Sequence, residues 1–360
     1  MNSLYIHIPF CNYICTYCDF CKKHNHSYNE DIYIDYLIKE LDLIKPKDID
    51  SIYIGGGTPS CINLRALKKL LSYLYSFKDL KEYTIEMNPD DINEELLILL
   101  KEYNVSRISL GIQSLSNKVL KQINRQYTKE EVYLKYNLLQ KYFDNISCDF
   151  MFNLPDQDMN DIDQIISFIK ENNLKHFSFY DLILEQNTVL NNKNYKGLSD
   201  EETSNIYSYI QEQFKEYNQY EISNYANPGY ESYHNIGYWT NKPYYGVGLS
   251  SSSLLNNTRF TNTRSIKDYY DALDLNKIPF IEKEVLSKED LDEEKIILSL
   301  RYNNFISVSD KIINIIKELN YESYFIIKDN EIKLKPSSYY ISNIIIVDIL
   351  LGMEKDENSN

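Results

Sequence analysis

The strongest constraint on the fold of this 360-residue chain is an alternation of short apolar runs with segments of helical spacing. The runs have the length of β-strands, and each returns after a few dozen residues, as parallel β-α-β units require. The predicted strands are Leu4–Ile8, Ser51–Ile54, Tyr83–Met87, Arg107–Gly111, Ile146–Phe150 and His176–Tyr180. Six such units predict an α/β fold, either a partial or complete β/α barrel or an open doubly wound sheet.

Two polar stretches divide the second half of the chain. Asn191–Asp200 predicts a linker, and the charged segment Lys283–Glu294 precedes a last block of helical and apolar runs. After the linker we expect a helix at Glu201–Tyr217 and then irregular chain to about Arg264. The expected regions are the β/α units over 1–190, a segment that completes the barrel over 191–284, and a smaller, mainly helical, winged-helix-like domain over 285–360.

Charge and hydropathy argue against several classes of protein. The formal net charge of −15 disfavours nucleic-acid binding, which needs a basic face. No secretory signal precedes the first predicted strand. The longest apolar run, near Ile344–Met353, is interrupted by Asp348 and is too short to span a bilayer. With only six cysteines and no disulfide scaffold, we expect a cytoplasmic protein.

Four of the six cysteines lie within eleven residues, in the stretch CNYICTYCDFC. Cys11, Cys15 and Cys18 have the spacing C-x3-C-x2-C, so their thiolates could hold three irons of a 4Fe–4S cluster and leave the fourth iron open. A zinc site completed by Cys21 is the main alternative, although four thiolates in one short loop would be crowded. A redox pair of Cys15 and Cys18 ranks third, because it leaves Cys11 without a function. The residues alone favour the cluster and leave the other two readings open.

Unusual residues follow the next three predicted strands. They are GGGTPS (Gly55–Ser60), EMNPDD (Glu86–Asp91) and LGIQS (Leu110–Ser114). In a parallel barrel the C-terminal ends of all strands meet at one mouth, where ligands bind. The glycines allow a small ligand with ammonium and carboxylate groups to approach the backbone, and Glu86 and Gln113 could complete its recognition. The sequence therefore predicts one ligand site beside the cysteines.

The segments YIHIPFCNYICTYCDF, IGGGTPS, EMNP, RISLGIQS and HNIGYW resemble, in order and spacing, the radical S-adenosylmethionine superfamily. The resemblance runs from about residue 4 to about residue 302. Within that superfamily, the segments resemble the branch that contains oxygen-independent coproporphyrinogen III dehydrogenase and related heme chaperones. It implies a partial parallel (β/α)6 TIM-like barrel in which Cys11, Cys15 and Cys18 ligate a 4Fe–4S cluster whose open iron binds S-adenosylmethionine. It also implies that this cofactor is surrounded by Tyr5, Tyr17, Gly56, Gly57, Thr58, Glu86, Gln113, Arg125 and Asp149.

Two features resemble the chaperones more than the dehydrogenase. The chain starts almost at the YIHIP strand, and CDF follows the third predicted ligand. The resemblance then implies that the protein binds heme and delivers it to apo-hemoproteins, some of them membrane-associated, and that it forms a homodimer. The alternative function is the radical decarboxylation of coproporphyrinogen III.

The HNIGYW segment holds His234, one of five histidines, and Trp239, the sole tryptophan. A histidine beside aromatic rings could ligate or flank a heme. From the residues alone, a histidine satisfied by hydrogen bonds in a packed loop is the preferred reading. The resemblance makes His234 the first heme candidate.

The chain departs from the family pattern at three places. The departures are Arg125-Gln-Tyr127 in place of Arg-x-His, Asn153-Leu-Pro-Asp156 in place of Gly-Leu-Pro-Gly, and Ser252 where many relatives carry histidine. Cys21 and Cys61 have no assigned role. Cys148, on a predicted strand, is expected to be a small core residue.

Overall fold

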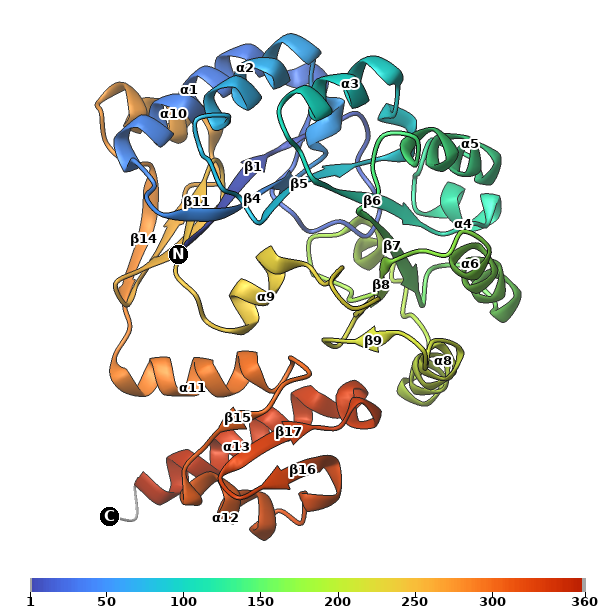
Figure 1. Ribbon diagram of the computed structural model, residues 1–360, viewed down its shortest axis with the longest axis vertical. Helices are drawn as coiled ribbons and strands as arrows, with labels where there is room; N and C mark the ends of the chain where they lie inside the picture. Colours follow the sequence, from blue (N-terminus) through green and yellow to red (C-terminus); the bar gives the residue numbers. More distant parts are fainter. Residues whose placement is uncertain (1, 358–360) are drawn as a thin grey trace.

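The computed structural model describes residues 2–357, and its centre is a parallel sheet made of the six predicted strands (Figure 1). They are adjacent in the order of the sequence, and each is parallel to the next. The strands are β1 (Asn2–Ile8), β4 (Ile49–Gly56), β5 (Glu82–Met87), β6 (Arg107–Gln113), β7 (Ile146–Phe152) and β8 (His176–Asp181). The predicted parallel β/α units are confirmed.

Helices connect these strands and cover the outer face of the sheet (Figure 1). They are α1 (Glu30–Ile44), α2 (Leu64–Leu74), α3 (Glu94–Glu102), α4 (Asn117–Gln122), α5 (Lys129–Leu139) and α6 (Met159–Glu171). The first three begin after an asparagine whose side chain accepts a hydrogen bond from a first-turn amide, as Asn63 does from Ala66 in α2. The buried side of α2 is a leucine-rich stripe at helical spacing, which packs toward the sheet.

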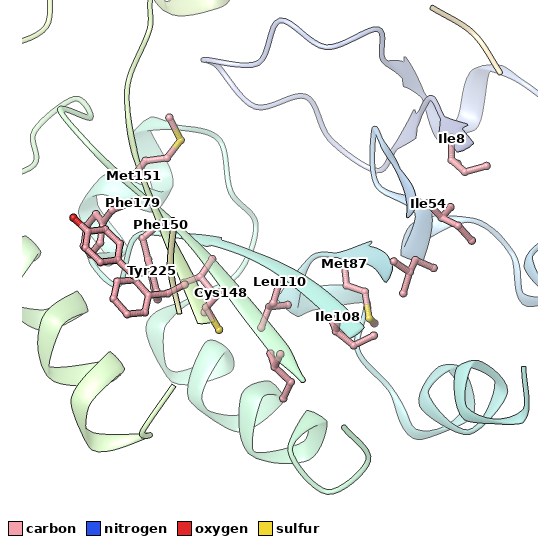
Figure 2. Close-up of a cluster of buried hydrophobic side chains, with 14 of the residues drawn as sticks. Ile8, Ile54, Met87, Ile108, Leu110, Cys148, Phe150, Met151, Phe179 and Tyr225 are labelled. Carbon is pink, nitrogen blue, oxygen red and sulfur yellow. The ribbon is translucent and has the colours of Figure 1, made fainter. Parts of the chain in front are cut away.

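The central strands present apolar side chains to the helices and polar side chains to the interior. Figure 2 shows part of the apolar set, in which Ile108, Leu110, Cys148 and Phe150 belong to one buried cluster. Cys148 is fully buried there, as expected of a core residue. Since side chains alternate along a strand, the residues between these ones face the other way. Ser109 and Asp149, among others, therefore line an internal cavity.

Residues 191–285 are more regular than the sequence predicts. Helices α7 (Val189–Asn192), α8 (Asp200–Gln213), α9 (Tyr233–Trp239) and α10 (Ile266–Asp274) alternate with strands of the same sheet. These strands are β9 (Asn218–Gln219), β10 (Asn224–Ala226), β11 (Tyr244–Val247), β12 (Ser252–Leu255), β13 (Thr258–Asn262) and β14 (Phe280–Val285). The expectation of irregular chain up to Arg264 was wrong because the strands pair with distant partners, β11 with β1 and β10 with β8.

Within residues 2–357 the sheet has twelve strands, in the order β14-β13-β12-β11-β1-β4-β5-β6-β7-β8-β10-β9. Strand β11 is parallel to β1, whereas β12, β13 and β14 follow it in antiparallel pairs. The two end strands, β14 and β9, do not pair with each other. The barrel is therefore partial, as expected.

The described chain after β14 forms α-helices and a small antiparallel sheet, drawn below the barrel in Figure 1. They are α11 (Lys288–Ser299), β15 (Ile306–Ser307), α12 (Asp310–Glu318), β16 (Phe325–Lys328), β17 (Glu331–Leu334) and α13 (Ser342–Glu357). The boundaries expected for three separate domains stay a prediction. Among the described residues, Pro336–Glu354 is long and apolar enough to cross a membrane by length and composition, with 33% of that window buried inside the protein. Ile345 and Ile349 of α13 belong to the core.

Candidate functional site

The cysteine segment follows β1 and forms a loop over the C-terminal ends of the central strands. Two short parallel strands, β2 (Phe10–Cys11) and β3 (Lys23–His24), pair at its base. Cys11, Cys15 and Cys18 all line one internal cavity of about 560 Å³. Cys21 is buried and does not line that cavity, and its carbonyl lies 2.8 Å from His7 Nε2. The three predicted ligands therefore share a cavity that the fourth cysteine of the loop does not reach.

The three thiols that line the cavity do not converge on one point as ligands of a single metal ion would. All six cysteines are free. Among residues 2–357, no three His, Cys, Asp or Glu side chains are grouped so that they could hold one metal ion. In a 4Fe–4S cluster each thiolate binds a different iron, so three thiolates need not converge on one point. The geometry thus disfavours the zinc alternative.

Burial favours the neutral thiol form of Cys11 and Cys18 in the protein alone. It raises the pKa of Cys11 to about 12 and the pKa of Cys18 above its ordinary value. Because iron binds the thiolate, loading the loop with a cluster would release these protons.

Gly57, the residue after β4, lets two backbone segments approach closely. A Cβ atom on Gly57 would lie 2.6 Å from the carbonyl oxygen of Phe10, which is closer than real Cβ atoms come to any heavy atom. The next residue, Thr58, donates its amide to the same carbonyl at 2.7 Å and its hydroxyl to Cys11 Sγ at 3.7 Å. The GGGTP segment therefore holds the backbone that leads into the first predicted ligand.

Glu86, near the end of β5, presents a half-buried carboxylate to the cavity. Its Oε1 accepts a hydrogen bond from the Tyr53 hydroxyl at 2.8 Å, and its Oε2 accepts one from the Gly56 amide at 3.0 Å. Burial raises the pKa of Glu86 to about 7, although both hydrogen bonds lower it. A ligand ammonium group beside this carboxylate would favour its ionised form.

Arg125 holds the cysteine loop against the barrel through a hydrogen bond to Tyr17. Its Nη2 donates to the Tyr17 hydroxyl at 2.8 Å, and its Nη1 donates to Asn88 Oδ1 at 2.6 Å. Tyr17 lies between two of the predicted ligands in the sequence, so the guanidinium positions the loop that carries them. Tyr127 donates its hydroxyl to the Gly111 carbonyl at 2.8 Å.

Asp149 and Gln113 lie on the same wall of the cavity. Ser109 and Ser178 donate hydrogen bonds to the two carboxylate oxygens of Asp149, each at 2.8 Å. Burial raises the pKa of Asp149. Gln113 has a left-handed backbone conformation with φ of 67°, at the point where the register of β6 against β7 shifts.

Two predicted contact residues lie outside the lining of this cavity. Tyr5 stacks on Tyr53, with 6.2 Å between ring centroids, and its hydroxyl lies 3.0 Å from His7 Nδ1. His234 is 1% exposed.

Both ring nitrogens of His234 are engaged. Ser51 Oγ lies 3.0 Å from Nδ1, and the Tyr238 hydroxyl lies 3.0 Å from Nε2. Burial lowers the pKa of this imidazole to about 3. The neighbouring Asn235, which sequence reasoning did not single out, lines the cavity instead. The arrangement matches a histidine satisfied by hydrogen bonds.

Sequence reasoning also missed the polar residues that the strands turn inward below the mouth. Arg107, Ser147 and Asn224 line the cavity together with Ser109 and Ser178. The signal was present as polar residues at every second position of β6, β7 and β8, between the apolar residues of the core.

Comparison with known proteins decides the family. The radical SAM superfamily matches residues 5–169. The heme chaperone HemW of Lactococcus lactis is 39% identical over 317 residues, which cover 85% of this chain and 83% of that protein. HemW of Bacillus subtilis is 35% identical and covers 84% of this chain and 83% of that protein. The chain belongs to the HemW family of radical SAM proteins.

A solved structure has the same fold as this HemW-family chain. Coproporphyrinogen III oxidase (HemN) from Escherichia coli, described as a radical SAM enzyme, matches with a TM-score of 0.84. The match covers 96% of this chain and 89% of that chain, at 19% identity. The family resemblance predicted from the motifs is confirmed, and so is the HemN-like α/β fold.

Proposed function

We propose that this HemW-family protein binds a 4Fe–4S cluster and S-adenosylmethionine and acts as a heme chaperone that delivers heme to apo-hemoproteins. The observation that carries the proposal is a single cavity lined by Cys11, Cys15, Cys18 and Glu86. Three thiols leave one iron of a cluster without a protein ligand, and the carboxylate suits the ammonium group of an amino acid. The relatives that are named heme chaperones support heme as the cargo.

Each residue of the site has a proposed part in holding the cofactors. The cysteines would ligate three irons, and Arg125 would fix their loop through Tyr17. The cofactor would also contact Gly56, Gly57, Thr58, Gln113 and Asp149, which line the same cavity, and Tyr5 would support that wall through its stacking on Tyr53. When bound, the cluster and S-adenosylmethionine supply electron transfer and radical chemistry.

His234 is the proposed heme contact. To ligate iron through Nε2, it would have to give up the Tyr238 hydroxyl that now lies 3.0 Å away. We expect His234→Ala to weaken heme binding or change the Soret spectrum while the iron–sulfur content stays unchanged. An unchanged heme titration would leave the histidine a structural role only.

The remaining parts of the proposal concern the surroundings of the protein. We propose a cytoplasmic location, which the six unpaired cysteines support, since thiols stay reduced there. Membrane-associated acceptors and a homodimer are part of the same proposal and come from the family resemblance.

A second candidate function is the oxidative decarboxylation of coproporphyrinogen III. The observation that favours it is the fold shared with the Escherichia coli oxidase. At 19% identity, that likeness supports the fold alone.

One experiment separates the two functions. Anaerobically reconstituted protein should bind about four irons and four sulfides, take up heme, and pass it to an apo-hemoprotein such as apomyoglobin. Conversion of coproporphyrinogen III to protoporphyrinogen IX with consumption of S-adenosylmethionine, and no heme transfer, would replace the chaperone proposal with the enzyme.

A further inference from the structure

The cavity holds a buried guanidinium that the proposed cofactor contacts do not use. Arg107, at the start of β6, lines the cavity and is 2% exposed. Its guanidinium donates from Nη2 to His176 Nδ1 at 3.3 Å. Its Nε has no hydrogen-bond partner within residues 2–357. An arginine has five N–H donors, and buried donors without partners are costly, so this side chain is prepared for an acceptor.

The neighbouring carboxylate balances the charge of Arg107 without satisfying its donors. Glu82 Oε2 lies 3.9 Å from Arg107 Nε, which is beyond hydrogen-bond distance. The Glu82 carboxylate accepts bonds from the start of α9 instead, namely from the amides of Tyr233 at 2.9 Å and His234 at 3.1 Å. The ion pair therefore leaves N–H donors of the guanidinium available to another acceptor.

A second donor reaches the same cavity from α9. The backbone amide of Asn235 donates to Ser232 Oγ at 3.3 Å, and the structure gives its side chain no hydrogen bond to any described residue. Asn235 is half-buried and lines the cavity together with Arg107. Both side chains can donate to one acceptor placed in this part of the cavity.

This part of the cavity is remote from the cysteines. Arg107 and Gly111 are four residues apart on β6, which corresponds to about 13 Å along a strand. Gly111 lies at the end of the strand that faces the cysteine loop, next to Arg125. A cofactor carboxylate bound at the open iron would therefore lie far from Arg107.

We propose that Arg107 and Asn235 form a subsite for a carboxylate of the ligand that enters the cavity. On the proposed function, on which this inference rests, that group is a propionate of heme. The planar fork of arginine matches the two oxygens of a carboxylate, and hydrogen bonds to an ionised group are stronger than neutral ones. An apolar ligand would leave Arg107 Nε without an acceptor.

The test compares heme with heme dimethyl ester, whose carboxylates are blocked, on the full-length reconstituted protein. The wild type should bind heme at least about tenfold more tightly than the ester, as expected for a charge-assisted hydrogen bond. Arg107→Gln should abolish that preference, whereas Arg107→Lys should retain part of it. The iron–sulfur content should stay unchanged in both variants.

Several results would overturn the subsite. Equal binding of heme and its ester by the wild type would exclude it, and so would a preference retained by Arg107→Gln. A loss of affinity for S-adenosylmethionine in Arg107→Gln, with the heme preference intact, would assign the carboxylate to the cofactor. Absence of any heme binding by the wild type would overturn the proposed function and this inference together.

A second variant guards against misfolding of Arg107→Gln. Asn235→Leu removes the other donor and leaves the ion pair of Arg107 and Glu82 in place. It should reduce the preference for heme over the ester, with unchanged circular dichroism and iron content. If Asn235→Leu keeps the full preference for heme over the ester, Asn235 is not part of the subsite. If, in addition, Arg107→Gln does not fold, that result overturns the proposal.

Discussion

The hydroxyl of Tyr53 donates a hydrogen bond to Glu86 Oε1 at 2.8 Å. The ring of the same tyrosine packs against the imidazole of His234, with 5.2 Å between the two centroids. One side chain on β4 therefore contacts both the carboxylate proposed for S-adenosylmethionine and the histidine of the HNIGYW segment. The two contacts can be separated by mutation.

Tyr53→Phe removes the hydrogen bond and keeps the ring. Since that bond lowers the pKa of Glu86, its loss should raise the pKa further above about 7 and leave less carboxylate ionised at neutral pH. We expect affinity for S-adenosylmethionine to fall by at least about tenfold, the worth of one hydrogen bond to a charged group. Equilibrium dialysis at pH 7 measures this. Tyr53→Phe should bind heme as the wild type does. Equal affinity of the wild type and Tyr53→Phe for S-adenosylmethionine would contradict the proposed role of Glu86 in binding this cofactor.

Gly57→Ala should disturb the cysteine loop. Its Cβ would lie 2.6 Å from a backbone oxygen, and backbone cannot give way as a flexible side chain can. We expect a loss of stability of about 1–3 kcal/mol, the typical cost of overpacking, and weaker retention of iron. Iron analysis and urea unfolding provide the measurement. Gly229→Ala is the control, because nothing lies within 4 Å of its Cβ position and only its φ of 89° opposes the change.

His234 should make stability depend on pH. Burial lowers its folded pKa to about 3, so the folded protein carries the neutral imidazole, whereas the unfolded chain takes up a proton below about 6.5. The contribution of the neutral, buried His234 to the free energy of unfolding is complete above pH 6.5 and is lost as pH falls toward 3. At pH 5 the loss is about 2 kcal/mol.

Urea unfolding of the cluster-free protein at pH 7.5 and pH 5 tests this expectation against His234→Gln, which cannot titrate. The stability difference between the two proteins should shrink by about 2 kcal/mol at the lower pH. His7 and His176 also have lowered pKa values, but they are present in both proteins and cancel. A difference that does not change with pH would show that His234 is not buried in its neutral form.

Cys21→Ala and Cys18→Ala should differ in iron content. Cys18 lines the cavity, whereas Cys21 is buried outside its lining and contributes its backbone carbonyl to a contact with His7. The carbonyl survives in Cys21→Ala, so that variant should bind about four irons, and Cys18→Ala should lose them. Iron and acid-labile sulfide are measured after anaerobic reconstitution. Iron loss in Cys21→Ala would mean that the ligand set includes the fourth cysteine.

The sequence predicted the elements whose pattern is local. The six central strands alternate with helices at fixed intervals, and glycines and cysteines follow their ends. Those signals placed Cys11 and Glu86 at one mouth before the structure was known.

The sequence could not predict what depends on distant partners. Strands β10 and β11 are short, and their pairing with β8 and β1 is invisible in a local window. The same limit applies to His234, whose hydrogen-bond partner Ser51 is 183 residues away in the sequence. Arg107 was overlooked because a charged residue at a strand end is usually solvated, whereas here the barrel encloses it.

The position of β1 between β4 and β11 affects how the protein folds during its synthesis on the ribosome. One partner of β1, strand β4, has been synthesised once the chain reaches residue 56. The other partner, strand β11, consists of residues 244–247 and is synthesised much later. At about 5–20 residues per second, roughly 10–40 s of synthesis separate the two pairings. During that interval one edge of the strand that leads into the cysteine loop has no partner. Iron that reaches the nascent chain would therefore meet the loop before the sheet around it is complete.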